Sequence, residues 1–447
     1  MAHNDLTQGS VPTSLAKLTA PMVMGVSSSI VVQTLEMGFI GQLSTAHVAA
    51  ITFTFPITMI LTSLALGISI GTSSVIARSV GSGERQDVKR LATHSVILVT
   101  LFMVLLSSLA WLSMDQIFRT MGASESLLVL IHTYMDIYLL GTVLFTITMI
   151  LGSVMRANGN AGIPGTIMTA GAAVNLIIDP ILIFGWFGLP RMELAGAATA
   201  MLITRVLTTT VMLFYVLKLD QVARRFEWSK FISSSRRILH IGLPAMATQL
   251  IGPVTGVIIT RMLAQHGETV VAGFGVATRI EAVAAMLMFA LSGSIGPFVG
   301  QNWGGKAPDR VREGVRVSYQ FCLLWGVVMA LPLFLFGHYM ASWIEPSEPV
   351  IAVAAIYLAI VPWSYGMWGV LMMASASFNA LGKPLPSTVL SFTRMFLVYV
   401  PLAMLLNSLM GYQGIFVAVL MSNALMGVAG YLWFRQRLQH MTLAVKA

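Results

Sequence analysis

The stretch IPGTIMTAGAAVNLIIDPILIFGWF, residues 163–187, decides the fold class, because Asp179 is the single charged residue in it. About 20 predominantly apolar residues are enough for a helix to cross the hydrocarbon core of a bilayer. This stretch therefore predicts a membrane-spanning helix. Stretches of the same kind recur along the chain, and twelve spans are predicted near 14–40, 46–78, 92–113, 127–155, 163–187, 194–217, 237–264, 270–302, 314–338, 350–380, 385–408 and 414–435.

The composition of the whole chain agrees with this prediction. Of its 447 residues 56% are hydrophobic and only 10% are charged, against about 25% charged residues in an ordinary soluble domain. So few charges cannot cover the water-facing surface of a soluble fold of this size. The composition excludes a cytosolic enzyme, a disordered protein and a disulfide scaffold. It predicts an all-α polytopic membrane protein with about twelve transmembrane helices.

The distribution of charge predicts the orientation. Lys and Arg number 26 and Asp and Glu 17, so the net charge is 26 − 17 = +9. The basic residues gather in the loops that follow the even-numbered spans and in the tail, whereas the opposite loops carry mainly acidic residues. Basic loops stay on the cytoplasmic side, so both termini are expected in the cytoplasm and the protein in the inner membrane. A basic surface that binds nucleic acid is not expected.

Motifs of enzymes and of bound cofactors are missing from the sequence. The histidines are scattered, Cys322 is the single cysteine, and no phosphate-binding loop occurs. No cofactor and no transition-metal site are therefore expected. An intramembrane hydrolase would need a nucleophile with a base. Glu36 and Asp179 could serve such a reaction only nominally, because no His, Ser or metal motif accompanies them, and we expect the protein not to be an enzyme.

The chain is predicted to consist of two related halves. Four pairs of residues share one offset of 223 positions: Pro21 and Pro244, Gly81 and Gly304, Val88 and Val311, and Ala157 and Ala380. A constant offset indicates an internal duplication. We therefore predict an N-lobe at 1–218, a cytoplasmic connector at 219–235 and a C-lobe at 236–447, forming two pseudo-symmetric six-helix bundles. Six-helix repeats are typical of transporters.

Acidic residues at membrane depth are expensive and by default indicate function. Glu36 lies in the outer part of the first span and Asp179 in the outer part of the fifth. Asn175 lies four residues before Asp179, so the two share a helix face. Two carboxylates close together in a low dielectric cannot both ionise easily. Such a pair can exchange a proton or share a cation. Pro180 lacks a donor N–H and predicts a kink beside the acid.

The second half differs in its charges. Its stretch near Pro401 keeps the proline but has no acid. Arg279 and Glu281 are candidates there for polar contacts, but residues two apart on a helix do not face each other. Coupling is therefore expected in the first half.

Four motifs together resemble those of the multidrug and toxic compound extrusion (MATE) transporters, and the resemblance covers the whole chain. They are the stretches at 36–43 (EMGFIGQL), 152–159 (GSVMRANG), 175–180 (NLIIDP) and 195–198 (AGAA). The pattern of Asn175 and Asp179, with Gln249 where another bacterial branch carries a glutamate, is similar to the DinF-like branch.

This resemblance implies a V-shaped pair of bundles that exports organic cations or amphipathic compounds in exchange for H⁺ or Na⁺. Glu36, Asn175 and Asp179 would then form the cation site of the N-lobe, with Thr34 and Thr199 as further candidates. The sixth-helix threonine that helps to bind Na⁺ in some relatives aligns with Met201. A hard cation prefers several oxygen ligands, so the sequence favours protons, although Na⁺ at Glu36, Asn175 and Asp179 stays possible.

The predicted function is that of a proton-coupled multidrug antiporter that works by alternating access. Outside, protonation of Glu36 and Asp179 would release the substrate, and inside, deprotonation would favour a cationic one. Its expected partners are small cationic or amphipathic molecules and the lipid bilayer, and it is expected to be a monomer. The alternatives are Na⁺-coupled efflux and a flippase for lipid-linked precursors, although the basic residues lie mostly in loops rather than in a central cavity.

Overall fold

The computed structural model describes residues 6–223 and 226–446, and within these ranges the secondary structure is helical with no strand. The first six long helices are α1 (Val11–Gly41), α2 (Thr45–Gly81), α3 (Arg85–Thr120), α4 (Glu125–Ala157), α5 (Gly162–Phe184) and α6 (Glu193–Lys218). A short 3₁₀ turn, η1 (Trp186–Gly188), lies between the last two. Among the described residues, twelve helices are long and apolar enough to span a membrane, which confirms the predicted number.

The later helices contain two irregular segments. The regular ones are α7 (Trp228–Ala264), α8 (Glu268–Gly304), α9 (Pro308–Ser342), α10 (Glu348–Ile360), α11 (Tyr365–Ala380), α12 (Pro384–Phe392), α13 (Val400–Met410) and α14 (Tyr412–Lys446). A 3₁₀ turn at Val361–Ser364, which contains a proline, joins α10 to α11 within one span. A π-helical segment at Thr393–Tyr399 joins α12 to α13. Such segments are rare and often lie at functional sites.

The chain forms two compact units. The first contains residues 20–246, and the second contains residues 6–19 and 247–446. The described residues of the predicted connector lie in the first unit, where the N–H of Ala223 donates to Oγ1 of Thr93 at 2.9 Å and to the carbonyl of Lys89 at 3.2 Å. The compact units are divided after Thr19 and after Met246. The lobe boundaries drawn from the sequence at 218 and 236 stay a prediction.

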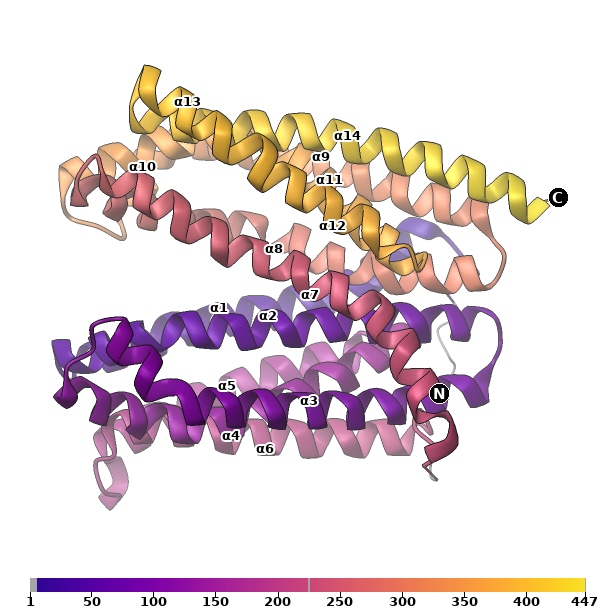
Figure 1. Cartoon of the computed structure of the whole chain (residues 1–447), viewed down its shortest axis with the longest axis horizontal. Coiled ribbons are helices and arrows are strands. Elements are labelled where there is room, and N and C mark those ends of the chain that lie inside the picture. Colours follow the sequence, from indigo (N-terminus) through magenta and orange to yellow (C-terminus); the bar gives the residue numbers. More distant parts are fainter. Residues whose placement is uncertain (1–5, 224–225, 447) are drawn as a thin grey trace. The chain divides into compact units, whose positions relative to one another are not determined.

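Each unit is built around one central helix (Figure 1). In the first unit α4 packs against α2, α3 and α6, and in the second unit α11 packs against α8, α9 and α14. Ala157, the last residue of α4, and Ala380, the last residue of α11, are one of the four pairs at the repeat offset. Both central helices therefore end at matching positions of the two halves.

Glycines allow the helices of the first unit to approach closely. A Cβ atom at Gly196 in α6 would lie 2.6 Å from the carbonyl oxygen of Leu182 in α5, and one at Gly165 in α5 would collide with the backbone of Pro21 in α1. Neither neighbouring atom can move without displacing a helix. These contacts bring α5 close to α1 at Pro21 and close to α6 at Gly196.

The fifth span ends earlier than the sequence predicts. The prediction extended it to residue 187, but α5 ends at Phe184 because Gly185 takes the left-handed conformation, with φ 74°. This conformation is accessible to glycine at little cost and commonly terminates a helix. The tail differs in the opposite direction, since α14 continues past the predicted end at 435 to Lys446.

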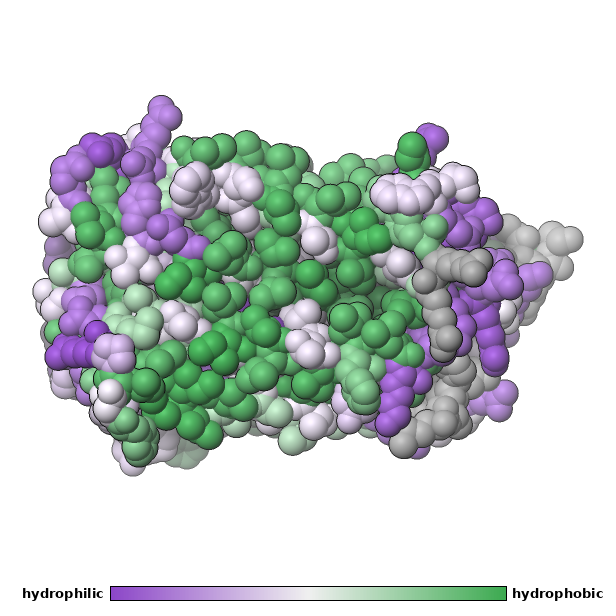
Figure 2. Space-filling view, turned by 90° about the horizontal axis from the view of Figure 1, so that it is seen from below, coloured by the Kyte–Doolittle hydropathy of each residue, from purple (hydrophilic) through white to green (hydrophobic). Residues whose placement is uncertain are grey.

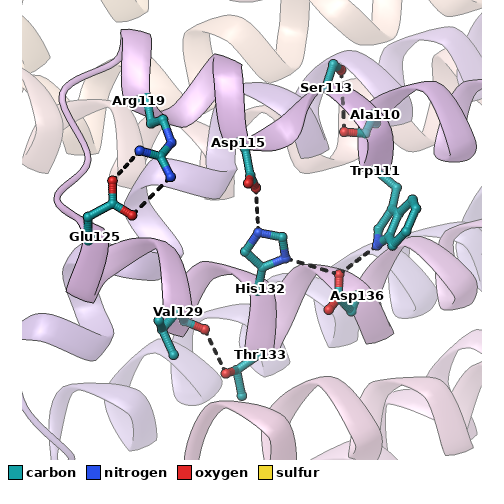
Figure 3. Close-up of polar contacts among 10 residues, drawn as sticks. All are labelled: Ala110, Trp111, Ser113, Asp115, Arg119, Glu125, Val129, His132, Thr133 and Asp136. Carbon is teal, nitrogen blue, oxygen red and sulfur yellow. Dashed lines mark hydrogen bonds and ion pairs between the residues drawn. The ribbon is translucent and has the colours of Figure 1, made fainter.

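The surface has the pattern expected of a membrane protein. On the face shown in Figure 2, hydrophobic residues gather along the middle of the helices and hydrophilic ones at the two ends. One polar group lies where α3 ends and α4 begins (Figure 3). There His132 contacts Asp115 at 2.5 Å and Asp136 at 3.6 Å, and the indole of Trp111 donates to Asp136 at 2.9 Å. Exposed ion pairs of this kind stabilise a fold by less than about 1 kcal/mol.

The close approach at Gly165 predicts a stability effect. Replacing Gly165 by Ala should destabilise the protein by about 1–3 kcal/mol, because the added methyl group must displace α1 or α5. Thermal unfolding of the purified protein in detergent measures this as a lower Tm. Gly252→Ala is the matched control, because a Cβ atom at that position in α7 meets open space. Equal Tm values for the two variants would contradict the tight contact.

Candidate functional site

Asn175 and Asp179 form a buried polar pair in α5. Asp179 is fully buried and Asn175 is 6% exposed. Nδ2 of Asn175 donates a hydrogen bond to Oδ2 of Asp179 at 2.7 Å. The sequence spacing of four residues placed both on one helix face, and the bond confirms this arrangement.

The second carboxylate oxygen of Asp179 has no partner. Oδ1 is buried and makes no hydrogen bond to any described residue. A buried acceptor without a partner costs about 1–3 kcal/mol, and more if it is charged. Binding a proton or a cation at Oδ1 would remove this cost, so the arrangement is suited to a site that is loaded and unloaded.

Glu36 lies near this pair. It is half-buried in α1, and the charges of Glu36 and Asp179 act on each other across the bundle. The structure therefore brings together the two acids that the sequence singled out, although they lie far apart in the chain. Since like charges repel in a low dielectric, one proton bound by either acid lowers the cost of ionising the other.

A basic residue, Arg205 of α6, completes the group. It is the cation that acts on Glu36. Its guanidinium group lies 5.0 Å from the ring centre of Tyr138 and 5.2 Å from that of Phe145, and Nη1 is 3.4 Å from Oγ1 of Thr142. Stacking on two rings fixes the cation at membrane depth.

Sequence reasoning missed Arg205, although the signal was present. The residue lies in the predicted span at 194–217, so the rule that selected Glu36 and Asp179 applies to it equally. Tyr134 was missed as well. It is buried, stacks on Tyr138 with ring centres 5.5 Å apart, and feels the charges of Glu36, Arg205 and Asp179. A tyrosine in a membrane span carries no comparable signal, because its side chain is uncharged.

The other predicted residues of the first unit lie as follows. Pro180 is buried, and α5 continues through it to Phe184. Thr34 is exposed, and its hydroxyl donates to the carbonyl of Ile30 in the preceding turn at 2.9 Å. Thr199 is half-buried in α6. Among the described residues no group of three His, Cys, Asp or Glu side chains is arranged to hold a metal ion.

The second unit holds a different polar cluster. Glu281 accepts hydrogen bonds from the hydroxyls of Tyr357 at 2.6 Å and of Tyr365 at 3.1 Å. Arg279 is exposed and forms no ion pair with Glu281, although both residues are described. Two phenolic donors thus bind one oxygen, Oε2, of this acid, whereas Asp179 accepts a bond from a single amide and has a buried oxygen without a partner.

The same cluster extends to the π-helical segment. Nη1 of Arg394 donates to Oδ1 of Asn423 at 2.7 Å, and Nδ2 of Asn423 donates to the hydroxyl of Ser364 at 3.0 Å. This chain of bonds connects the π-helical segment at Thr393–Tyr399 to α14 and to the 3₁₀ turn at Val361–Ser364. We interpret it as a structural network, since its members are satisfied by one another.

A family model described as MatE matches the chain twice, at residues 21–181 and 244–405. The chain belongs to the MATE family. The two matches begin at Pro21 and Pro244, and 244 − 21 = 223, which is the offset of the repeat. The predicted family and the predicted duplication are both confirmed.

This MATE chain is similar to known relatives in sequence and to a solved structure in fold. It is 32% identical over 419 residues to a Shewanella oneidensis protein named FAD transporter, covering 93% of each chain. It is 24% identical to the probable multidrug resistance protein YoeA of Bacillus subtilis, covering 89% of this chain and 87% of that one. The crystal structure of the Vibrio cholerae MATE transporter VcmN in the bent form is similar with a TM-score of 0.92 and 29% identity, covering 97% and 98%. The protein is therefore a multi-pass membrane transporter with the two-lobe fold.

The electrostatic interaction between Arg205 and Glu36 predicts energetic coupling. Arg205→Met and Glu36→Gln should each change the free energy of unfolding, and the double variant should differ from the sum by about 0.5–3 kcal/mol, because each residue compensates the charge of the other. Unfolding by heat or denaturant in detergent measures this cycle. The control cycle pairs Arg205→Met with Glu268→Gln at the start of α8, and should be additive. An additive Arg205–Glu36 cycle would contradict the interaction.

Proposed function

We propose that this MATE transporter is a proton-coupled antiporter that exports cationic or amphipathic compounds by alternating access. The observation that carries the proposal is the buried carboxylate of Asp179, with one oxygen held by Asn175 and the other without a partner. Glu36 and Asp179 exchange the proton, and Asn175 positions Asp179. The protein works as a monomer in the inner membrane, with both termini in the cytoplasm.

Coupling requires that the proton change the affinity for the substrate in one state of the carrier. Two ionised acids near one another attract a cationic substrate, and protonation from the outside removes that attraction. The substrate then leaves and the protonated carrier returns. On the inside the acids lose their protons, and the cycle begins again. Arg205 keeps one positive charge beside Glu36 throughout.

The choice of proton over sodium rests on the ligand set. A proton needs one free oxygen, and Oδ1 of Asp179 supplies it. A hard cation prefers several oxygen ligands, and the residue of α6 that aligns with the sodium-binding threonine of some relatives is Met201. Sodium coupling at Glu36, Asn175 and Asp179 is the alternative that the transport assay tests.

The aromatic side chains favour flat substrates. Tyr134, Tyr138 and Phe145 lie around the charged group, and stacked or edge-on ring contacts suit planar cationic molecules. A second candidate substrate is FAD, because the Shewanella oneidensis relative at 32% identity is named an FAD transporter. FAD combines flat rings with a pyrophosphate, and Arg205 provides a cation for the latter.

The central test is transport by the purified protein in proteoliposomes. A proton gradient and a sodium gradient are imposed separately, and uptake of a cationic dye and of FAD is followed. Asp179→Asn should abolish dye transport driven by the proton gradient, because it removes the titratable group and keeps the shape. Asp115→Asn is the matched control, since Asp115 is exposed at the far end of α3, and it should transport at the rate of the unmodified protein.

The outcomes separate the alternatives. Transport driven by sodium alone would replace the proton in the proposal by a metal ion at the same residues. Undiminished transport by Asp179→Asn would remove the acid pair from the mechanism. Movement of FAD but not of dye would change the substrate class, and movement of neither under both gradients would favour the lipid-precursor flippase.

A further inference from the structure

The second unit contains a groove that the proposed transport site does not use. It has a volume of about 820 Å³ and lies between α9 and α14, both of which pack against α11. Its walls come from these three helices. The groove extends from the ends of α9 and α14 that carry basic residues toward their apolar middle.

One end of the groove is strongly basic. Arg312 and Arg316 of α9 and Arg435 of α14 line it, and its described lining includes no acidic residue. Arg312 contacts Asp309 at 3.5 Å, where both side chains are more than half exposed. Arg316 and Arg435 form no salt bridge with a described residue. The guanidinium groups of Arg316 and Arg435, with Arg312 beside them, make a site for an anion.

Next to the arginines, the groove is lined by a tyrosine with a buried hydroxyl group. Tyr319 is 7% exposed, and its Oη makes no hydrogen bond to any described residue. Its ring packs edge-on against Tyr431 of α14, with ring centres 5.7 Å apart. A buried hydroxyl without a partner is costly, so this one is suited to donate to an oxygen of a bound molecule.

Beyond the tyrosines the groove is apolar. Leu323, Met367, Val370 and Val428 line this part. Leu323 lies seven residues after Arg316, which corresponds to about 10 Å along a helix. The outer surfaces of α9 and α14 continue with exposed apolar side chains, among them Leu324, Val327, Leu425 and Leu432. A molecule with a charged head at the arginines would therefore place an apolar tail against a lipid-facing surface.

In the first unit, residues of the predicted connector cover the surface that corresponds to this groove. The repeat offset relates Arg312, Arg316 and Tyr319 to Lys89, Thr93 and Val96 (312 − 223 = 89, 316 − 223 = 93 and 319 − 223 = 96). There the connector bonds to Lys89 and Thr93 through Ala223, and Val222 and Val96 pack against the same apolar cluster. In the second unit the corresponding positions line an open groove and carry more positive charge.

We propose that this groove binds an anionic phospholipid from the cytoplasmic leaflet, with its phosphate at Arg316, Arg435 and the hydroxyl of Tyr319 and an acyl chain along Leu323 and Val428. Basic pockets between helices on the cytoplasmic side bind anionic lipid head groups. The placement rests on the orientation that the basic loops indicate, and does not depend on the transported substrate or the coupling ion.

Lipid binding to the purified full-length protein tests the proposal. Native mass spectrometry in detergent compares phosphatidylglycerol with phosphatidylcholine of the same acyl chains, and glycerol phosphate serves as the head group alone. Phosphatidylglycerol should bind preferentially. The double variant Arg316→Gln/Arg435→Gln should lose about 30-fold in affinity, from two basic contacts to an anionic lipid. Tyr319→Phe should lose about threefold to tenfold, from one hydrogen bond.

The control is the double variant Arg85→Gln/Arg437→Gln, which removes the same charge from exposed positions outside the groove. It should bind phosphatidylglycerol like the unmodified protein. Thermal unfolding confirms that each variant is folded, and Tyr319→Phe keeps the test informative if the arginine variant is not. Equal losses in the two double variants would overturn the site, as would equal binding of phosphatidylcholine. Binding of glycerol phosphate as tight as that of the lipid would show a site for soluble anions instead.

Discussion

The hydrogen bond between Asn175 and Asp179 holds a carboxyl group inside a mostly apolar bundle, and the first unit is organised around this constraint. An acid at the centre of a membrane helix costs about 2.5–3.5 kcal/mol on insertion scales. The cost is tolerable only if protein, rather than lipid, surrounds the group. The close approaches at Gly165 and Gly196 bring α1 and α6 against α5, and these two helices supply Glu36 and Arg205.

The two units show how a duplicated frame can carry different chemistry. Their central helices end at matching positions and the family model begins at matching prolines. The acid of the second unit, Glu281, nevertheless accepts bonds from two tyrosines at Oε2, whereas Asp179 has a buried oxygen without a partner. The surface grooves differ too, since the connector closes one and the other is open. Packing has been kept through the duplication, while the polar groups have diverged.

Much of this organisation could be predicted from the sequence, because the bilayer imposes long apolar runs that are easily recognised. The number of spans, the duplication, the family and the shared face of Asn175 and Asp179 follow from such local patterns. The role of Arg205 and Tyr134 did not follow, because it depends on which helices are neighbours. The end of α5 at Gly185 was also missed, since the apolar run continues beyond it to Phe187. The π-helical segment at Thr393–Tyr399 has no sequence signal that we could have used.

The helices α1 and α7 each contain a boundary between the two compact units. Residues 6–19 belong to the second unit and the rest of α1 to the first, whereas α7 begins in the first unit and passes into the second after Met246. Pro21 and Pro244, the related prolines, lie within three residues of these two crossings. A proline removes one backbone hydrogen bond from a helix, so bending there breaks fewer bonds than elsewhere. The duplication has thus placed a proline, which lacks a backbone N–H, close to each point where a helix passes from one compact unit to the other.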